Sequence, residues 1–337
     1  MKKALIVAAA IALIVWVISW FRAPQAMATS AAREWPAGLG TLDSVASRYP
    51  PMHANDAARK LTALAKALPK NEVVQNFVTR EIVHDSIDIG QPPTLPDVSA
   101  MRDLLLREPV VWDRTAGVND FGDDATTERR VVQMAIARAL VAGALKEASW
   151  EDLHAVWNLV RSMDAQPQMM SQTASLAMVR MINAVAWKMP LPPPEWFAEL
   201  QRRDDLRHLL EAYQHQAAAH LQKPIFQLFP IKPFADAIEN DRRVAEFVFH
   251  ETRCDVTSPM NDAGTDLSSV WRRAFRYRAE QEATANAIRV RKGKPIETRS
   301  RCSDGSWSFD GTTLRFSRAI ATAAPDRPMP LVLHPDG

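Results

Sequence analysis

Helical periodicity is the feature that most constrains how this chain folds. Between Val132 and Gly143, and again between Trp150 and Val160, apolar or small residues recur every three or four positions. This spacing places them on one face of an α-helix. Because only a few residues separate the two patterns, the sequence predicts two consecutive helices joined by a tight turn.

The same periodicity extends over most of the chain. It predicts further helices at residues 55–68, 72–86, 172–187, 194–217, 234–250 and 267–290. Prolines interrupt the pattern at several joints, and a proline ends a helix because its ring clashes with the preceding turn. Helix following helix through short joints predicts an antiparallel bundle or a short α-solenoid.

The pattern changes near the C-terminus. Four apolar residues alternate with polar ones around Asp310 and Gly311, namely Trp307, Phe309, Leu314 and Phe316. Alternation about an Asp-Gly pair is typical of a β-hairpin. A lone hairpin is unstable in water, so we expect its apolar face to pack on the helices. The expected fold class is therefore mainly α with a small C-terminal β-hairpin.

Two segments resemble a known group of proteins. The sequences RYPPMHANDAARKLTALAKALP, at residues 48–69, and ARALVAGALKEASWEDLHAVWNLVRSM, at residues 137–163, resemble an uncharacterised group of bacterial helical proteins with an N-terminal membrane anchor. The resemblance implies a helical fold beyond a membrane-anchored N-terminus. That group has no assigned activity, so no catalytic residue follows from the resemblance.

The first residues predict export. Lys2 and Lys3 precede an uncharged apolar run from Ala4 to Phe21, which is long enough to cross a bilayer. The length of the run favours a retained anchor, whereas the small residues Ala26 and Ala28 fit cleavage after Ala28, so both alternatives remain open. We expect a signal anchor or signal peptide at 1–28, a tether at 29–50, a helical ectodomain at 51–320 and a flexible tail at 321–337. The expected location is the bacterial inner membrane, as a single-pass protein with most of the chain in the periplasm.

The chain contains two cysteines, Cys254 and Cys302. In an oxidising compartment an even pair predicts a disulfide. The competing interpretation is a Cys-His nucleophile, because His250 lies four residues before Cys254. No residue that would orient such a histidine is identifiable, so the disulfide is the stronger prediction.

Charge and motifs exclude several classes of function. The formal net charge is only +2, which argues against nucleic-acid binding. Charge is nevertheless uneven, because residues 268–301 hold ten Arg or Lys against three Glu, and residues 81–124 hold ten Asp or Glu against three Arg. No phosphate-binding glycine loop or serine-hydrolase motif occurs, and the sequence predicts no cofactor.

Two groups of residues have metal-ligand spacing. Glu81 with His84, and Glu151 with His154, repeat the Glu-x-x-His pattern by which helical bundles bind metal ions. A metal-dependent enzyme using these four residues is the alternative function. His208, Glu211 and His215 also share one helix face, and we expect them to point to solvent.

The segment at residues 223–234, KPIFQLFPIKPF, carries apolar side chains between prolines. Phe226, Phe229, Ile231 and Phe234 are the predicted partner-binding residues, although the segment could also fold down onto the helical core. With no convincing catalytic set, we expect a binding or scaffolding module for a protein or envelope component, anchored to the cytoplasmic membrane. A structural envelope protein is the remaining alternative.

Overall fold

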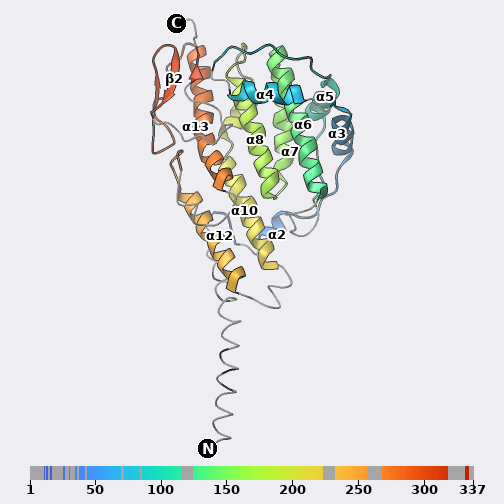
Figure 1. The fold of residues 1–337 in the computed structure, drawn as a ribbon, viewed down its shortest axis with the longest axis vertical. Helices are drawn as coiled ribbons and strands as arrows, with labels where there is room; N and C mark the ends of the chain where they lie inside the picture. Colours follow the sequence, from blue (N-terminus) through green and yellow to red (C-terminus); the bar gives the residue numbers. More distant parts are fainter. Residues whose placement is uncertain are drawn as a thin grey trace, which may run out of the picture. The chain divides into compact units, whose positions relative to one another are not determined.

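Helices form most of the chain in the computed structural model (Figure 1). The structure describes residues 38–41, 44–69, 72–83, 86–114, 124–222, 232–256, 268–317 and 331–333, together with Ile11, Leu13, Trp16, Ala26, Ser30 and Trp35. These residues form a mainly helical protein with a small three-stranded antiparallel sheet near the C-terminus. The predicted mainly α class with C-terminal β structure is therefore confirmed.

The helices follow the predicted order. They are α2 (Val45–Arg48), α3 (Asp56–Ala67), α4 (Glu72–Val83), α5 (Ser99–Arg107), α6 (Asp124–Glu147), α7 (Trp150–Asp164), α8 (Met169–Ala186), α9 (Trp196–Arg202), α10 (Asp205–Gln222), α12 (Lys232–His250) and α13 (Ser268–Arg291). The sequence predicted neither α2, which lies in the segment expected to be a tether, nor α5, and α9 and α10 replace one expected helix.

Polar side chains set several helix boundaries. The Asn55 carboxamide accepts a hydrogen bond from the backbone N–H of Ala58 and caps α3, while the Ser149 hydroxyl caps α7. The break between α9 and α10 has a similar cause. Arg203 leaves the helical conformation, and the Asp204 carboxylate accepts a hydrogen bond from the N–H of Arg207 at 3.1 Å, which caps the next helix.

Internal contacts divide the chain into two compact units. The first contains residues Met1–Pro50, Ala116–Asp120 and Leu210–Glu251, and the second contains Pro51–Thr115, Phe121–Leu209 and Thr252–Gly337. In the first unit, Gln214 on α10 donates a hydrogen bond to the Gly40 carbonyl and accepts one from Arg48. Part of the segment expected to be a tether is therefore held against α10.

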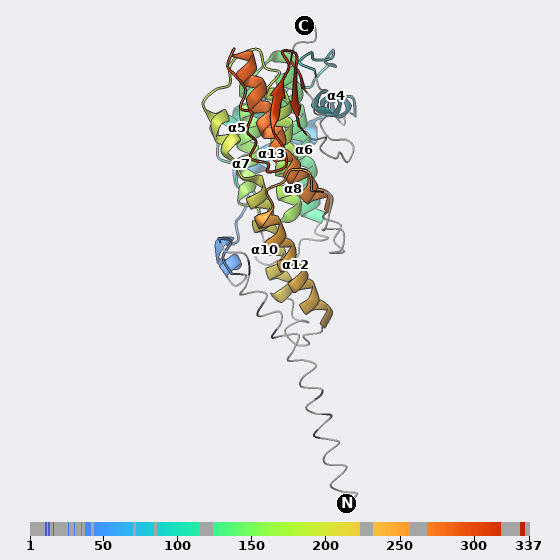
Figure 2. The ribbon, with the colours of Figure 1, turned by 90° about the vertical axis from the view of Figure 1, so that its left-hand side faces the viewer.

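In the second unit, α6, α7 and α8 lie side by side and contact one another (Figures 1 and 2). Apolar side chains between them are fully buried, such as Leu140, Val156 and Ile182. α8 also contacts α13, and α3 and α4 pack on α6. The three central helices therefore form the core that positions the surrounding elements.

The sheet has strand order β1-β2-β3, with β1 at Trp307–Phe309, β2 at Thr313–Phe316 and β3 at Leu331–Val332. Trp307 pairs with Phe316 and Phe309 pairs with Leu314, so the predicted hairpin is present. β3 adds a strand from the segment expected to be a flexible tail, because Leu331 and the following Leu333 are buried in the same cluster as Leu314. Figure 2 shows the sheet against α13, whose alanines at 279, 283 and 287 complete this cluster.

Among the described residues, no helix is long and apolar enough to span a bilayer. The apolar run at residues 4–21 falls outside the described residues except at Ile11, Leu13 and Trp16, and so do two of the three residues of the predicted cleavage site.

Candidate functional site

The largest hollow described here is a groove of about 650 Å³ in the second unit, bordered by α3, α4 and α6. This volume lies within the range of roughly 300–1,000 Å³ that is typical of ligand-binding pockets. Buried apolar side chains form its floor, namely Ala65, Val74, Val132 and Ala139. We call this hollow the α3/α4/α6 groove.

Polar pairs border the α3/α4/α6 groove. The Lys66 ammonium lies 2.7 Å from the Glu128 carboxylate, and the Arg138 guanidinium donates a hydrogen bond to the side-chain amide oxygen Oε1 of Gln75 at 3.2 Å. Hydrogen bonding to Lys66 lowers the pKa of Glu128, and burial lowers the pKa of Arg138. With Glu72, which also borders the groove, two cationic and two anionic side chains surround the apolar floor.

One side chain of the groove is unusually exposed for its type. Val131 on α6 leaves 65% of its surface accessible, more than any other large apolar residue in the described globular part of the chain. Exposed apolar side chains beside a hollow are a common feature of protein-binding surfaces. The arrangement resembles the apolar floor and polar rim of a protein interface.

The local sequence explains how the groove forms. α3 ends at Ala67 because Leu68 is extended and Pro69 follows, and α4 starts again at Glu72. Both helices pack on α6, so their ends leave α6 incompletely covered near Val131. No sequence pattern predicted this site, although Val131 and Val132 interrupt the polar start of α6 as adjacent apolar residues.

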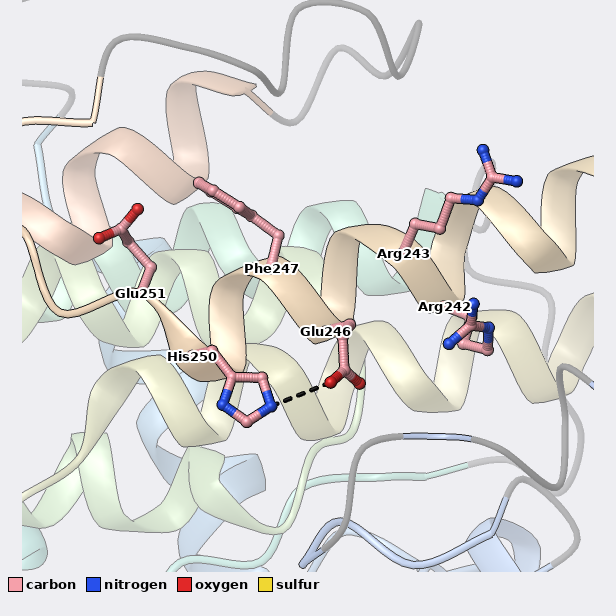
Figure 3. A pocket seen from close by; sticks show the side chains of 6 residues that line it. All are labelled: Arg242, Arg243, Glu246, Phe247, His250 and Glu251. Carbon is pink, nitrogen blue, oxygen red and sulfur yellow. Dashed lines mark hydrogen bonds and ion pairs between the residues drawn. The ribbon is translucent and has the colours of Figure 1, made fainter.

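A second hollow, of about 450 Å³, lies along α12 in the first unit. Figure 3 shows that its lining side chains spread around the helix, with Phe247 pointing away from His250. The His250 imidazole and the Glu246 carboxylate form a hydrogen bond of 2.9 Å, and both are exposed. Because these side chains do not converge on one point, this hollow is the weaker candidate.

The residues predicted to bind a partner are only partly described. Phe226, Phe229 and Ile231 lie outside the described residues, and Phe234 lies in α12 with a side chain that is not described. That prediction stays open.

The predicted metal residues have other contacts. His84 lies outside the described residues. The Glu81 carboxylate is buried, accepts hydrogen bonds from Arg80 and from the Gly90 N–H, and lies 3.9 Å from the Lys188 ammonium. Gly90 permits this approach, because a Cβ there would lie 2.7 Å from the carboxylate. Glu81 is therefore held by cations and a backbone amide.

The second predicted metal pair lies at the start of α7. Glu151 is exposed in the first turn, where its charge favours the helix dipole, and the His154 ring stacks on Trp196 with centroids 5.0 Å apart. Burial lowers the pKa of His154. Among the described residues, no group of three or more His, Cys, Asp or Glu side chains is arranged to bind a metal ion.

His215 differs from its expected position. We expected it to point to solvent together with His208 and Glu211, but only 7% of its surface is exposed and its ring packs edge-on against Tyr49. The N-terminal segment supplies this cover, which the helix pattern around His215 does not reveal.

The predicted disulfide is present between Cys254 and Cys302, whose Cα atoms lie 5.4 Å apart. The bridge rules out the alternative Cys-His nucleophile, because Cys254 has no free thiol. The backbone N–H groups of Cys254 and Asp255 both donate to the Asp304 carboxylate at 3.1 Å. The bridge therefore lies within a hydrogen-bonded junction between the two chain segments.

The sequence and the structure were also compared with known proteins. No protein-family model, no curated protein sequence and no solved structure matches this chain.

Proposed function

We propose that this protein is a binding module that accepts an apolar segment of a protein partner in the α3/α4/α6 groove. The observation that carries the proposal is the apolar floor of the groove beside the exposed Val131. An amphipathic helix presents apolar side chains every three or four residues, and such a helix fits a groove between helices.

The balanced charges of the border support a mainly apolar partner segment. Lys66 and Glu128 already neutralise each other, so neither requires a charged group from the partner. The Lys66–Glu128 pair is exposed and contributes little binding free energy, whereas buried apolar side chains contribute most of it. We expect affinity to depend on the apolar residues of the partner.

We also propose that the module is tethered to the bacterial inner membrane and faces the periplasm. The apolar run from Ala4 to Phe21 after two lysines supports this location. The disulfide between Cys254 and Cys302 supports it independently, since disulfides persist in oxidising compartments and are rare in the cytosol. The resemblance to membrane-anchored helical proteins is consistent with the same location.

Within the second unit we propose an antiparallel helical bundle rather than a solenoid. α7 follows α6 after two residues and α8 follows α7 after four, and each pair is in contact. α6 and α8 also contact each other directly. In a solenoid each repeat would contact only its neighbours along the array, whereas three mutually contacting helices enclose a common core.

Site-specific crosslinking tests the binding proposal. A photoreactive benzophenone amino acid at position 131, in the full-length protein expressed in its membrane, is expected to form an adduct with a partner protein. The same amino acid at Met170, an exposed residue of α8, serves as the matched control and is expected to form none. Ala135→Gln, which fills the groove from α6 without adding charge, is expected to abolish the adduct from position 131.

Adducts of equal yield from positions 131 and 170 would contradict the proposal, because they would reflect chance proximity. No adduct from either position, together with a loss of envelope integrity on deletion, would favour a structural envelope protein. Stoichiometric metal in the purified protein would favour the metal-dependent enzyme with Glu81, His84, Glu151 and His154.

The location is tested separately. Alkaline phosphatase fused at the C-terminus is expected to be active, because that enzyme requires an oxidising compartment to form its disulfides. A fluorescent reporter that matures only in the cytosol is expected to stay dark in the same position, and the reverse outcome would overturn the proposed location.

A further inference from the structure

The C-terminal end of α13 concentrates positive charge. Arg289, Arg291, Lys292 and Lys294 lie within six residues. Among the described residues, no carboxylate forms an ion pair with any of these four side chains. Elsewhere on α13, Arg276 pairs with Glu280 at 3.1 Å. This end of the helix therefore gathers four cationic side chains without a carboxylate partner among the described residues.

The backbone already caps this helix end. The N–H of Gly293 donates to the Val290 carbonyl at 2.8 Å, and the N–H of Lys294 donates to the Arg289 carbonyl at 2.9 Å. Gly293 has a positive φ of 64°, as this capping motif requires. Because main-chain groups satisfy these two carbonyls, the Lys292 and Lys294 side chains are not needed to cap the helix.

A small hollow lies beside these cations. It measures about 270 Å³ and is bordered by Met189, the turn at residues 190–193, Ile288, Arg291 and Lys292. Leu191 at the turn leaves 61% of its surface exposed. The hollow thus combines apolar side chains with two cationic ones.

The walls of this hollow are held in place. The Trp150 indole N–H donates to the Leu191 carbonyl at 3.2 Å, and the Arg291 guanidinium donates to the carbonyls of Trp187 and Met189. Three prolines further restrict the turn at 190–193. A site with fixed walls loses little conformational entropy when a ligand binds.

The surroundings of Arg291 are a second indication that this hollow binds an anionic ligand. Its guanidinium is half-buried and fixed only by neutral carbonyl groups, and burial lowers its pKa. A desolvated cation without a counter-ion is unfavourable, and an incoming carboxylate would relieve that cost.

We propose that the hollow between the 189–193 turn and the end of α13 binds an acidic peptide segment of a partner protein, with an apolar side chain next to its carboxylates. Lys292, Lys294 and Arg291 attract the carboxylates, and the apolar side chain contacts Leu191 and Met189. A concave site with room for about one side chain fits a peptide better than a membrane, because a bilayer is engaged by protruding apolar residues. This site is separate from the α3/α4/α6 groove and does not depend on the function proposed for it.

Peptide titration with the full-length protein tests this assignment. The probe is a fluorescent peptide of alternating glutamate and leucine, and the control probe replaces glutamate with glutamine. We expect the acidic peptide alone to raise fluorescence anisotropy, with binding that weakens as salt rises because the charges are exposed. The double variant Lys292→Glu/Lys294→Glu is expected to weaken binding by about tenfold or more.

A matched double variant, Lys60→Glu/Lys146→Glu, makes the same change of net charge at other exposed positions and is expected to bind as the wild type does. Equal losses in both double variants would overturn the assignment, because they would show only general charge attraction. The last measurement uses vesicles of anionic phospholipid. Binding to these vesicles without binding to the peptide would overturn the proposal in favour of a membrane surface. Equal binding of the acidic and glutamine peptides, or no binding of either, would also overturn the proposal.

Discussion

The disulfide is expected to hold the C-terminal sheet on α13. It joins Cys254 to Cys302 over a sequence separation of 48 residues. Without it, the sheet remains attached through its apolar cluster and through Glu282, whose carboxylate accepts a hydrogen bond from the Trp307 indole at 2.8 Å. Cys254→Ala/Cys302→Ala therefore removes the covalent constraint and takes only the two sulfur atoms out of this cluster.

The magnitude follows from the length of the closed loop. In the chain-entropy model, closing a loop of 48 residues lowers the entropy of the unfolded loop by about 14 cal/mol/K, which corresponds to about 4 kcal/mol at 25 °C. Because α13 lies inside this loop, the value is an upper limit for an opening of the sheet that leaves α13 folded. A free-energy change of this size corresponds to about a thousandfold change in an opening equilibrium. Both cysteines are only 1% exposed, so lost packing of the two sulfur atoms adds to the effect.

Native-state hydrogen exchange measures this opening directly. Amides in residues 307–316 are expected to exchange faster in the double variant than in the wild type, by more than about tenfold and by at most about a thousandfold. Amides of α7 serve as the internal reference and are expected to change much less. Ser303→Ala removes the hydrogen bond between the Thr252 and Ser303 hydroxyls but keeps their backbone hydrogen bond and the disulfide, so it is the matched control and is expected to have a small effect.

A change below about tenfold at residues 307–316 would refute the reasoning, because it would mean that packing and hydrogen bonds hold the sheet without the covalent link. An equal acceleration in α7 would refute the proposed local role, because the bridge would then stabilise the second unit as a whole.

Three further changes test the local arguments. Burial raises the pKa of Asp152 from 3.8 to about 6, so its contribution to stability is present below pH 4 and is lost as pH rises through 6. The free energy of unfolding of Asp152→Asn should hence equal that of the wild type at pH 4 and exceed it by about 3 kcal/mol at pH 8. A urea midpoint below that of the wild type at pH 8 would contradict this expectation. Gly305→Ala places a Cβ 2.1 Å from the Phe316 ring and should lower the stability of the sheet by about 1–3 kcal/mol. Hydrogen exchange of the β2 amides measures this loss. Unchanged protection of these amides would show that the Phe316 ring can move aside. Asn55→Ala removes the cap of α3 and should lower the free energy of unfolding by about 1 kcal/mol or more in urea, because the Asn55 side chain also bonds the Val111 N–H and the Pro109 carbonyl. Asn55→Asp keeps the acceptor for the Ala58 and Val111 N–H groups but loses the donor to Pro109, so it should restore only part of this stability.

The sequence predicted the elements that depend on neighbouring residues. The cap at Ser149 and the apolar faces of α6 and α7 are local patterns, and a helix follows from them directly. The β-hairpin follows in the same way from alternation around Asp310 and Gly311. The disulfide was predictable because two cysteines permit only one intramolecular pairing.

Long-range contacts decided what the sequence did not reveal. The Arg203 side chain donates to Asp164 on α7, Ser175 on α8 and Asp205, and these contacts accompany the break between α9 and α10 where a continuous helix was expected. β3 is too short to be recognised alone and forms only because β2 offers an edge beside a buried apolar cluster.

The candidate sites, too, depend partly on local sequence and partly on long-range contacts. Sequence spacing indicated a metal site at Glu81, His84, Glu151 and His154, but the tertiary structure gives Glu81 the cation Lys188 as a neighbour and stacks His154 on Trp196. The groove near Val131 is defined by where α3 and α4 stop covering α6, which depends on packing between distant segments. Local sequence therefore determined which helices and turns form, because these depend on nearby residues, whereas only the tertiary structure decided which surfaces remain uncovered.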